Sequence, residues 1–162
     1  MQDSKKHLIF AGISGFILIL DQWTKWLILR ELTIHATLPV IPGFFNIVHV
    51  QNPGGAFGIF AGESTMIRAA LFVFIALIAV GLVFYLHYRT PPEYRLLTAG
   101  FALIFSGALG NLIDRIRYGK VIDFIDVHVG TWHWPAFNVA DSAISVGMVV
   151  FAWYLLVKKV PA

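Results

Sequence analysis

The chain alternates between long apolar stretches and polar connections of unequal length. The apolar stretches cover approximately residues 8–29, 66–88, 96–113 and 138–157. A membrane-spanning helix needs about 20 predominantly apolar residues, and each stretch is of that order. The pattern therefore predicts an all-α membrane protein that crosses the bilayer four times.

The connections predict how the spans are arranged. The connection between the second and third spans is short and contains Pro91 and Pro92, whereas the outer segments of about 30–65 and 114–137 are long. With four spans, both termini share one side of the membrane and both long connections share the other. We expect residues 1–162 to form a single integral membrane domain.

Two short runs in the long connections alternate between apolar and polar residues. They cover residues 44–51 and 121–127, and the first ends in the turn sequence Asn52-Pro53-Gly54-Gly55. Alternation with a period of two is typical of a strand with one buried face, and an N-P-G-G sequence is a strong turn signal. We therefore expect a small β-sheet or loop region at the membrane surface.

Composition agrees with a membrane protein and excludes several classes of chemistry. Hydrophobic residues make up 58% of the chain and charged residues 13%, whereas a soluble domain has roughly 25% charged residues. The chain has no cysteine, which excludes disulfides, a thiolate nucleophile and a thiolate metal site. The net charge of +3 is small and the basic residues are scattered, so no nucleic-acid partner is expected.

The N-terminus has some features of a secretory signal, because Lys5 and Lys6 precede an apolar run. A cleaved signal has small residues after its apolar region. Here Asp21-Gln22-Trp23 follows, and the apolar pattern then resumes. We interpret this segment as a retained first span.

Charged residues occur at the ends of the spans, where they need a partner or a function. Asp21 and Lys25 lie late in the first span, Asp114 and Arg115 end the third, and Asp141 begins the fourth. A charge at membrane depth costs at least about 2.5 kcal/mol on insertion scales. All of these positions fall near the surface that carries the long connections, which indicates one polar site there.

Asp123 and Asp141 have two open interpretations. Two carboxyl groups held close together share one proton, so that one can act as a base toward water while the other polarises a carbonyl. Alternatively, Asn138 and Asp141 are an N-cap and its third-position acid, and Asp123 is an exposed strand residue. The spacing alone does not decide between a catalytic pair and these structural roles.

Two further groups of polar residues lie at helical spacing. Asn111, Asp114 and Arg115 fall on one face of the third span, where they either orient a substrate or clamp the outer segments. Asp21 and Lys25 are four residues apart, and we interpret them as a structural pair.

The remaining candidates are a turn and two histidines. Asn52 and Gly54 lie in a glycine-rich turn whose backbone can approach a ligand closely, although a plain hairpin turn has the same sequence. The spacing of His128 and His133 matches no standard zinc pattern, so no metal site is expected.

Five blocks of this sequence resemble one known family, the lipoprotein signal peptidases, also called signal peptidase II. They occur in family order at family spacing, and Ser106 is one departure, because the family commonly has glycine there. The blocks are D-Q-W-T-K (21–25), N-P-G-G-A-F (52–57), G-A-L-G-N-L-I-D-R (107–115), V-I-D-F (121–124) and F-N-V-A-D-S (137–142).

The resemblance implies an intramembrane aspartyl peptidase of the bacterial inner membrane. Such enzymes remove the signal peptide of prolipoproteins just before a cysteine that carries diacylglycerol. They need no metal or other cofactor, and the cyclic peptide globomycin inhibits them. The implied catalytic pair is Asp123 and Asp141. The residues implied to hold substrate or brace the site are Asn52, Gly54, Asn111, Asp114, Arg115 and Asn138.

The orientation in the membrane follows in part from charge. Lysine and arginine are equally numerous on the two sides, but Lys25 and Arg115 each have an acid neighbour on their own span. Discounting these two favours cytoplasmic termini by the positive-inside rule. The resemblance likewise implies a site facing the periplasm.

Two other functions are compatible with intramembrane acids. A proton-coupled carrier uses such acids as a relay, although carrier sites usually lie near the midplane between repeated halves, and no repeat is visible here. The second alternative is a structural membrane subunit without activity. That function would not explain why Asp114 lies near the C-terminal end of a helix, where the helix dipole disfavours an acid.

Overall fold

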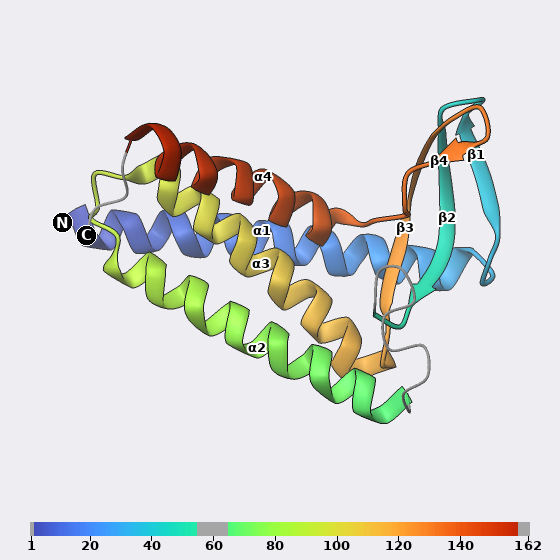
Figure 1. Cartoon of the computed structure of the whole chain (residues 1–162), viewed down its shortest axis with the longest axis horizontal. Helices are drawn as coiled ribbons and strands as arrows, with labels where there is room; N and C mark the ends of the chain where they lie inside the picture. Colours follow the sequence, from blue (N-terminus) through green and yellow to red (C-terminus); the bar gives the residue numbers. More distant parts are fainter. Residues whose placement is uncertain (1, 55–64, 159–162) are drawn as a thin grey trace.

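The computed structural model describes residues 2–54 and 65–158, and of residues 65–69 and 158 it describes the backbone alone. Helices run side by side along the molecule, and a small β-sheet lies at one end (Figure 1). The start of α1 and the end of α4 lie together at the opposite end. Gly55, Ala56 and Phe57 of the glycine-rich block, and the rest of residues 55–64 in the first long connection, lie outside the described residues.

The helices are those expected from the apolar stretches, extended at most of their ends. They are α1 (Gln2–Glu31), α2 (Thr65–Arg89), α3 (Arg95–Tyr118) and α4 (Val139–Trp153), which continues into the π-helical turn η2 (Tyr154–Lys158). Within the described residues, four helical segments are long and apolar enough to cross a membrane. Large apolar side chains such as Phe16, Ile78 and Val149 are exposed on their outer faces, as expected for contact with lipid. The four-span prediction is confirmed.

Helix α3 is the centre of the bundle. In the most apolar 18-residue stretch of α3, 61% of the residues are buried, against 11 to 22% in the corresponding stretches of the other helices. It approaches α4 closely, because a Cβ atom at Gly147 would lie 2.6 Å from the carbonyl oxygen of Gly100. Gly107 likewise faces the carbonyl oxygen of Ala140. These contacts hold α4 along α3, and the second places the start of α4 beside the middle of α3, one turn before Asn111.

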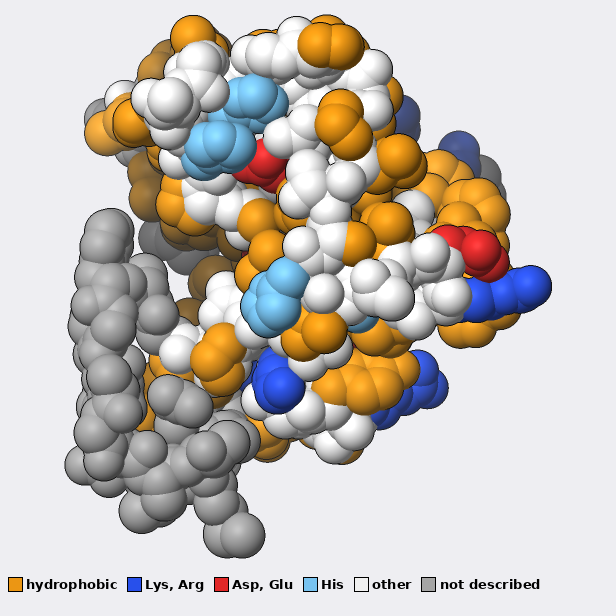
Figure 2. Space-filling view, turned by 90° about the vertical axis from the view of Figure 1, so that its right-hand side faces the viewer, with side chains coloured by type: hydrophobic (Ala, Val, Ile, Leu, Met, Phe, Trp, Pro, Cys, Tyr) orange, Lys and Arg blue, Asp and Glu red, His pale blue; other side chains and the backbone are white. Residues whose placement is uncertain are grey.

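The sheet has the strand order β1-β2-β3-β4 and is antiparallel throughout. Its strands are β1 (Thr37–Ile41), β2 (Phe45–Asn52), β3 (Val121–Val129) and β4 (Trp132–His133). Strands β2 and β3 are the two predicted from alternation, and their register places Val50 opposite Asp123. Ile28 of α1 packs with Ile122 and Phe124 of β3, so the sheet is fixed to the end of the first helix. Figure 2 faces this end and shows histidines gathered beside an acidic side chain.

Candidate active site

The polar residues singled out in the sequence converge at the sheet end of the bundle. They come from α1, α3, the start of α4, and strands β2 and β3. Most are buried, namely Asp21, Lys25, Gly54, Asn111, Asp114, Asp123 and Asn138, whereas Arg115 and Asp141 are half-buried and Asn52 is exposed. The structure therefore brings the predicted site residues into one connected cluster.

Asp141 is held at the first turn of α4 by a capping box. The Asn138 side chain accepts a hydrogen bond from the Asp141 backbone N–H at 2.9 Å, and the Asn138 backbone N–H donates to Asp141 Oδ2 at 3.3 Å. Asn111 Nδ2 donates to the other oxygen, Oδ1, at 2.7 Å. The predicted cap is confirmed, and it coexists with a place for Asp141 in the cluster. Capping and catalysis are therefore not alternatives for this residue.

Asp123 lies in the middle of the cluster on β3 and is only 2% exposed, so the alternative interpretation of Asp123 as an exposed strand residue is wrong. Asn138 Nδ2 donates to its Oδ1 at 2.7 Å, and Asn52 Nδ2 donates to its Oδ2 at 3.1 Å. Burial raises the pKa of Asp123 to about 7, and the nearby Asp141 carboxylate adds to the shift. Asp123 therefore keeps its proton far more readily than an ordinary aspartate does.

Asn138 joins the two carboxyl groups. Its side chain is fully buried, and Nδ2 also lies 3.2 Å from the Ile122 carbonyl oxygen and 3.3 Å from Asn111 Oδ1. Both aspartates thus bind one residue, Asp123 through the amide nitrogen and Asp141 through the capping box. The sequence does not predict that both aspartates contact Asn138. The conformation of the connection between β3 and α4, which decides this, has no local sequence pattern.

A buried lysine on α1 connects three residues of the cluster. Lys25 Nζ lies 2.9 Å from Asp21 Oδ2 and 2.8 Å from Asp114 Oδ2, and it donates to Asn111 Oδ1 at 3.0 Å. The expected pair of Asp21 with Lys25 is present, and Asp114 from α3 joins it. Asp21 also accepts a hydrogen bond from the Ala140 backbone N–H at 2.9 Å, which ties α1 to the start of α4.

Asp114 has a structural explanation at the end of α3. Its Oδ2 accepts a hydrogen bond from the Ile122 backbone N–H at 3.2 Å, next to Asp123. Gln22 donates to Asp114 Oδ1 at 3.0 Å and to Asp21 Oδ2 at 3.2 Å. Gln22 was not among the predicted residues, although it lies inside the D-Q-W-T-K block.

Arg115 and the turn after β2 flank the cluster. The Arg115 guanidinium lies over the Phe72 ring at 5.5 Å, and Nη1 lies 3.4 Å from the Asn111 carbonyl oxygen. Gly54 has a φ of +91°, and a Cβ there would lie 2.5 Å from the same Phe72 ring, so only glycine suits this position. The Gly54 N–H donates to Asn52 Oδ1 at 2.9 Å, which orients the Asn52 amide toward Asp123.

A cavity of about 380 Å³ opens beside Asp141. It is lined by Trp134, Phe137, Asp141, Ser142, Ser145 and Val146. The aromatic and aliphatic side chains make its walls apolar, and the half-buried carboxylate lies at its edge. Asp141 is therefore open to a group that enters this cavity.

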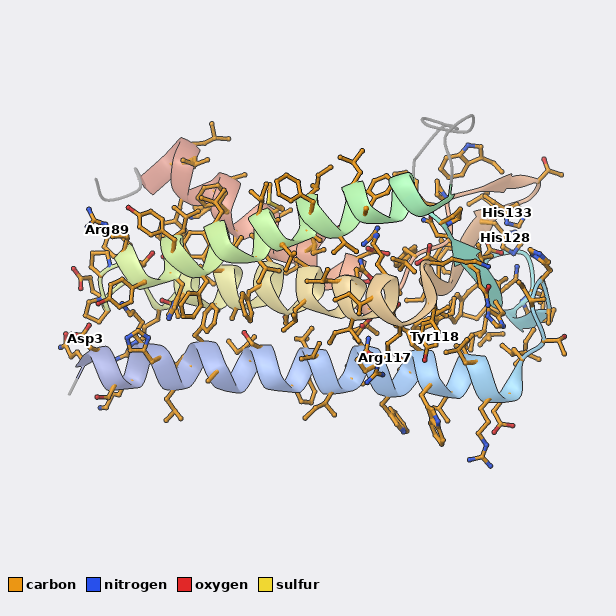
Figure 3. All side chains as sticks on the ribbon, turned by 90° about the horizontal axis from the view of Figure 1, so that it is seen from below. Asp3, Arg89, Arg117, Tyr118, His128 and His133 are labelled. Carbon is orange, nitrogen blue, oxygen red and sulfur yellow. The ribbon has the colours of Figure 1, made fainter. Side chains whose placement is uncertain are left out.

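The histidines at the sheet end form a separate cluster. His128 and His133, which Figure 3 labels, stack with their ring centroids 4.5 Å apart. His133 Nδ1 lies 2.8 Å from Asp126 Oδ1, and Asn46 Nδ2 donates to Asp126 Oδ2 at 2.7 Å. Burial alone would raise the pKa of Asp126, but the hydrogen bonds from His133 and Asn46 outweigh it and lower that pKa. Among the described residues, no three histidine, aspartate or glutamate side chains are placed to hold a metal ion.

Known proteins are similar to this chain over most of its length. The family model of signal peptidase (SPase) II matches residues 13–157. The lipoprotein signal peptidase of Desulforapulum autotrophicum is 51% identical over 149 residues, which cover 92% of each chain. That of Syntrophus aciditrophicus is 43% identical over 155 residues, which cover 96% of each chain.

Solved structures are similar to this chain as well. A bacterial membrane enzyme determined by the in meso method at 1.9 Å resolution is 34% identical and superposes with a TM-score of 0.82, covering 93% of this chain and 94% of that one. A similar structure at 2.3 Å resolution is 33% identical, with a TM-score of 0.81 and coverage of 94% and 92%. The family model matches most of the chain, and the curated relatives are up to 51% identical to it, which shows that this protein belongs to the signal peptidase II family.

Proposed function

We propose that the protein is an aspartic endopeptidase that removes the signal peptide of diacylglyceryl-modified prolipoproteins, cutting just before the lipidated cysteine. The observation that carries this proposal is the pair of carboxyl groups, Asp123 and Asp141, joined through Asn138 at one end of a membrane-spanning bundle. Membership of the lipoprotein signal peptidase family supports the substrate class. Membership of a peptidase family does not support the two other functions considered, a proton-coupled carrier and a structural membrane subunit.

The two carboxyl groups have different roles in this mechanism. Asp123 holds the shared proton, since burial raises its pKa to about 7, and donates it to the oxygen of the scissile carbonyl. Asp141, half-buried at the edge of the cavity, acts as the base that takes a proton from the attacking water. When the tetrahedral intermediate collapses, the C–N bond breaks, Asp141 passes its proton to the leaving nitrogen, and Asp123 recovers a proton from the intermediate's hydroxyl group.

The surrounding residues orient this pair or hold the peptide. Asn111 and Asn138 donate to the carboxyl groups and so fix their positions. Asp114 holds the start of β3 through the Ile122 N–H, and Arg115 packs on Phe72 beside Gly54. Asn52 is exposed next to Asp123, where its amide can also contact a substrate backbone. This chemistry needs no metal ion or cofactor.

The proposed orientation places the termini in the cytoplasm and the sheet at the periplasmic face of the bacterial inner membrane. The sheet, whose strand β3 carries Asp123, lies at the end opposite the start of α1, and α4, which carries Asp141 in its first turn, begins on the sheet side of the bundle (Figure 1). A diacylglyceryl anchor concentrates the substrate in the bilayer, because each buried methylene contributes about 0.8 kcal/mol. The bond to be cut then lies near the headgroups, at the depth of the carboxyl pair.

The direct test is cleavage by the purified protein in detergent. A precursor that carries diacylglycerol on its cysteine should be cut at that cysteine, whereas the same precursor without the lipid should remain intact. Globomycin should block the reaction. Equal cleavage of the two precursors would refute the proposed lipid requirement, and cleavage of neither would refute the proposed activity.

The rate of cleavage should fall as the pH rises through about 7. Asp123 keeps its proton below its raised pKa of about 7 and loses it above, and the pair then has no proton to donate to the carbonyl. A pH–rate profile from about pH 5 to about pH 9 measures this decrease in the cleavage rate. A rate that increases steadily across the range would contradict the assignment of the proton to Asp123.

A further inference from the structure

A second polar site lies at the opposite end of the molecule, away from the sheet. A cavity of about 270 Å³ is formed by the first turns of α1 and the connection from α2 to α3. Its lining includes the polar residues Gln2, Lys5, Lys6, Glu93 and Arg95. Figure 3 shows Asp3 and Arg89 at the same end. The proposed peptidase mechanism uses none of these residues.

The cavity carries an excess of positive charge. Lys5, Lys6 and Arg95 face it with Glu93 as the one acid of its lining. Among the described residues, none of these three cations forms an ion pair with an acid. A concave site with uncompensated cations attracts an anion.

Lys6 makes this a built site rather than a patch of surface lysines. Its side chain is only 5% exposed, and Nζ donates to the Thr90 carbonyl oxygen at 2.9 Å and to that of Tyr88 at 3.3 Å. An ammonium group has three donors, so one N–H remains beyond these two bonds. The end of α2 and the residue that follows it therefore fix a buried cation in the wall of the cavity.

Helix geometry adds to the positive potential. Helix α1 begins at Gln2 and α3 begins at Arg95, so the N-terminal ends of both helices border the cavity. No side chain caps the start of α3 at Tyr94. The positive end of a helix dipole favours a bound anion.

The position of the cavity selects a lipid over a free anion. Leu8 and Leu96 lie within one turn of the basic residues and are 73% and 54% exposed, and Tyr88 is 67% exposed. Such side chains on a membrane-spanning helix face lipid chains. An anion in the cavity thus lies where the polar end of the bundle meets its lipid-facing surface, which is the depth of a phospholipid phosphate.

We propose that this cavity binds the phosphate of an anionic phospholipid in the leaflet on the side of the termini. Lys5 and Arg95 would contact the phosphate from two sides, with Lys6 at its base, while the acyl chains lie along Leu8 and Leu96. Basic pockets between membrane helices bind anionic headgroups in this way. The site would anchor the end of the bundle that lies farthest from the peptidase chemistry.

The test is a titration of delipidated protein in detergent with phosphatidylglycerol, followed by native mass spectrometry. The double variant Lys5→Gln with Arg95→Gln removes two exposed cations without disturbing the Lys6 contacts. Each charge is worth roughly a five-fold change in affinity, so we expect phosphatidylglycerol to bind at least about ten-fold more weakly to this variant. The charge-conserving variant Lys5→Arg with Arg95→Lys should bind like the wild type.

A matched control removes two exposed cations at the sheet end, through Arg30→Gln with Arg117→Gln. This control should bind phosphatidylglycerol like the wild type, and phosphatidylcholine should bind weakly to every variant. If Lys5→Gln with Arg95→Gln binds phosphatidylglycerol as tightly as the control does, the site is refuted. If inorganic phosphate displaces the lipid at equal concentration, the cavity is a site for free anions and the lipid assignment is overturned.

Discussion

Replacing either Asp123 or Asp141 by asparagine should reduce cleavage of a diacylglyceryl prolipoprotein by about 100- to 10,000-fold. In each variant one of the two proton-transfer groups is gone, and positioned acid–base groups contribute roughly 10²- to 10⁴-fold each. An amide at position 123 has no acidic proton to give the carbonyl, and an amide at position 141 cannot take one from water. The measurement is the initial rate of peptide release by purified variants.

The fold of Asp123→Asn should survive, so that the loss can be assigned to chemistry. Asparagine has nearly the same shape, and its oxygen can still accept a hydrogen bond from Asn138 Nδ2. The folded pKa of Asp123 lies above its unfolded value of 3.8, so the protonated group favours the folded state, and this stability is lost as the pH rises from about 3.8 through about 7. The variant lacks this loss, and its melting temperature in detergent should therefore vary less with pH than that of the wild type.

Asp126→Asn is the matched control for this experiment. Asp126 lies three residues along the same strand, is likewise buried, and accepts a hydrogen bond from an asparagine, Asn46. It does not take part in the cluster around Asn138, and we expect Asp126→Asn to cleave at close to the wild-type rate. If Asp123→Asn and Asp126→Asn were equally active, the catalytic pair would be wrong.

The sequence predicts the fold well where the pattern is local. The apolar stretches predict the helices because each span satisfies its backbone internally, and the helices continue past them because polar residues such as Gln2 and Glu31 extend the same hydrogen-bonded ladder. Alternation predicts β2 and β3. Strand β1 was missed because it contains Pro39 and all its residues are exposed, so that no alternation marks it.

The sequence predicts which residues form the site, but it does not predict which of their side chains contact one another. Helical spacing shows that Lys25 can pair with Asp21, but the second partner, Asp114, lies on another helix. The burial of Asp123 and its shared partner with Asp141 depend on how α4 begins beside β3. Such contacts arise from tertiary packing, which periodicity does not describe.

Lys25→Met should destabilise the protein by about 3–5 kcal/mol, which is typical when one partner of a buried ion pair is removed. Lys25 and both of its acid partners are at most 2% exposed. Methionine fills a similar volume but leaves two buried carboxyl groups, Asp21 and Asp114, without their cation. Reversible unfolding in mixed detergent measures the free energy of unfolding.

The control for Lys25→Met is Arg30→Met on the same helix. Arg30 pairs with Glu31, but these side chains are 64% and 63% exposed, and exposed pairs contribute little because water screens them. Arg30→Met should therefore unfold like the wild type. The triple variant Asp21→Asn, Lys25→Met, Asp114→Asn should recover part of the loss, since it leaves no buried charge unpaired. Equal stability of Lys25→Met and Arg30→Met would contradict the buried network.

Lys25→Met should also slow cleavage, although Lys25 makes no direct hydrogen bond with either proposed catalytic residue. Lys25 Nζ donates to Asn111 Oδ1, which fixes the orientation of that amide so that Nδ2 faces Asp141 Oδ1. Without the lysine, the longer contact from Asn138 Nδ2 at 3.3 Å alone holds the Asn111 oxygen. The amide can then turn over more readily, which would place an oxygen against the carboxylate in place of a donor. Asp141 would lose one of the hydrogen bonds that position it. A rate that stays at the wild-type value in the fraction that remains folded would show that Lys25 contributes to stability alone.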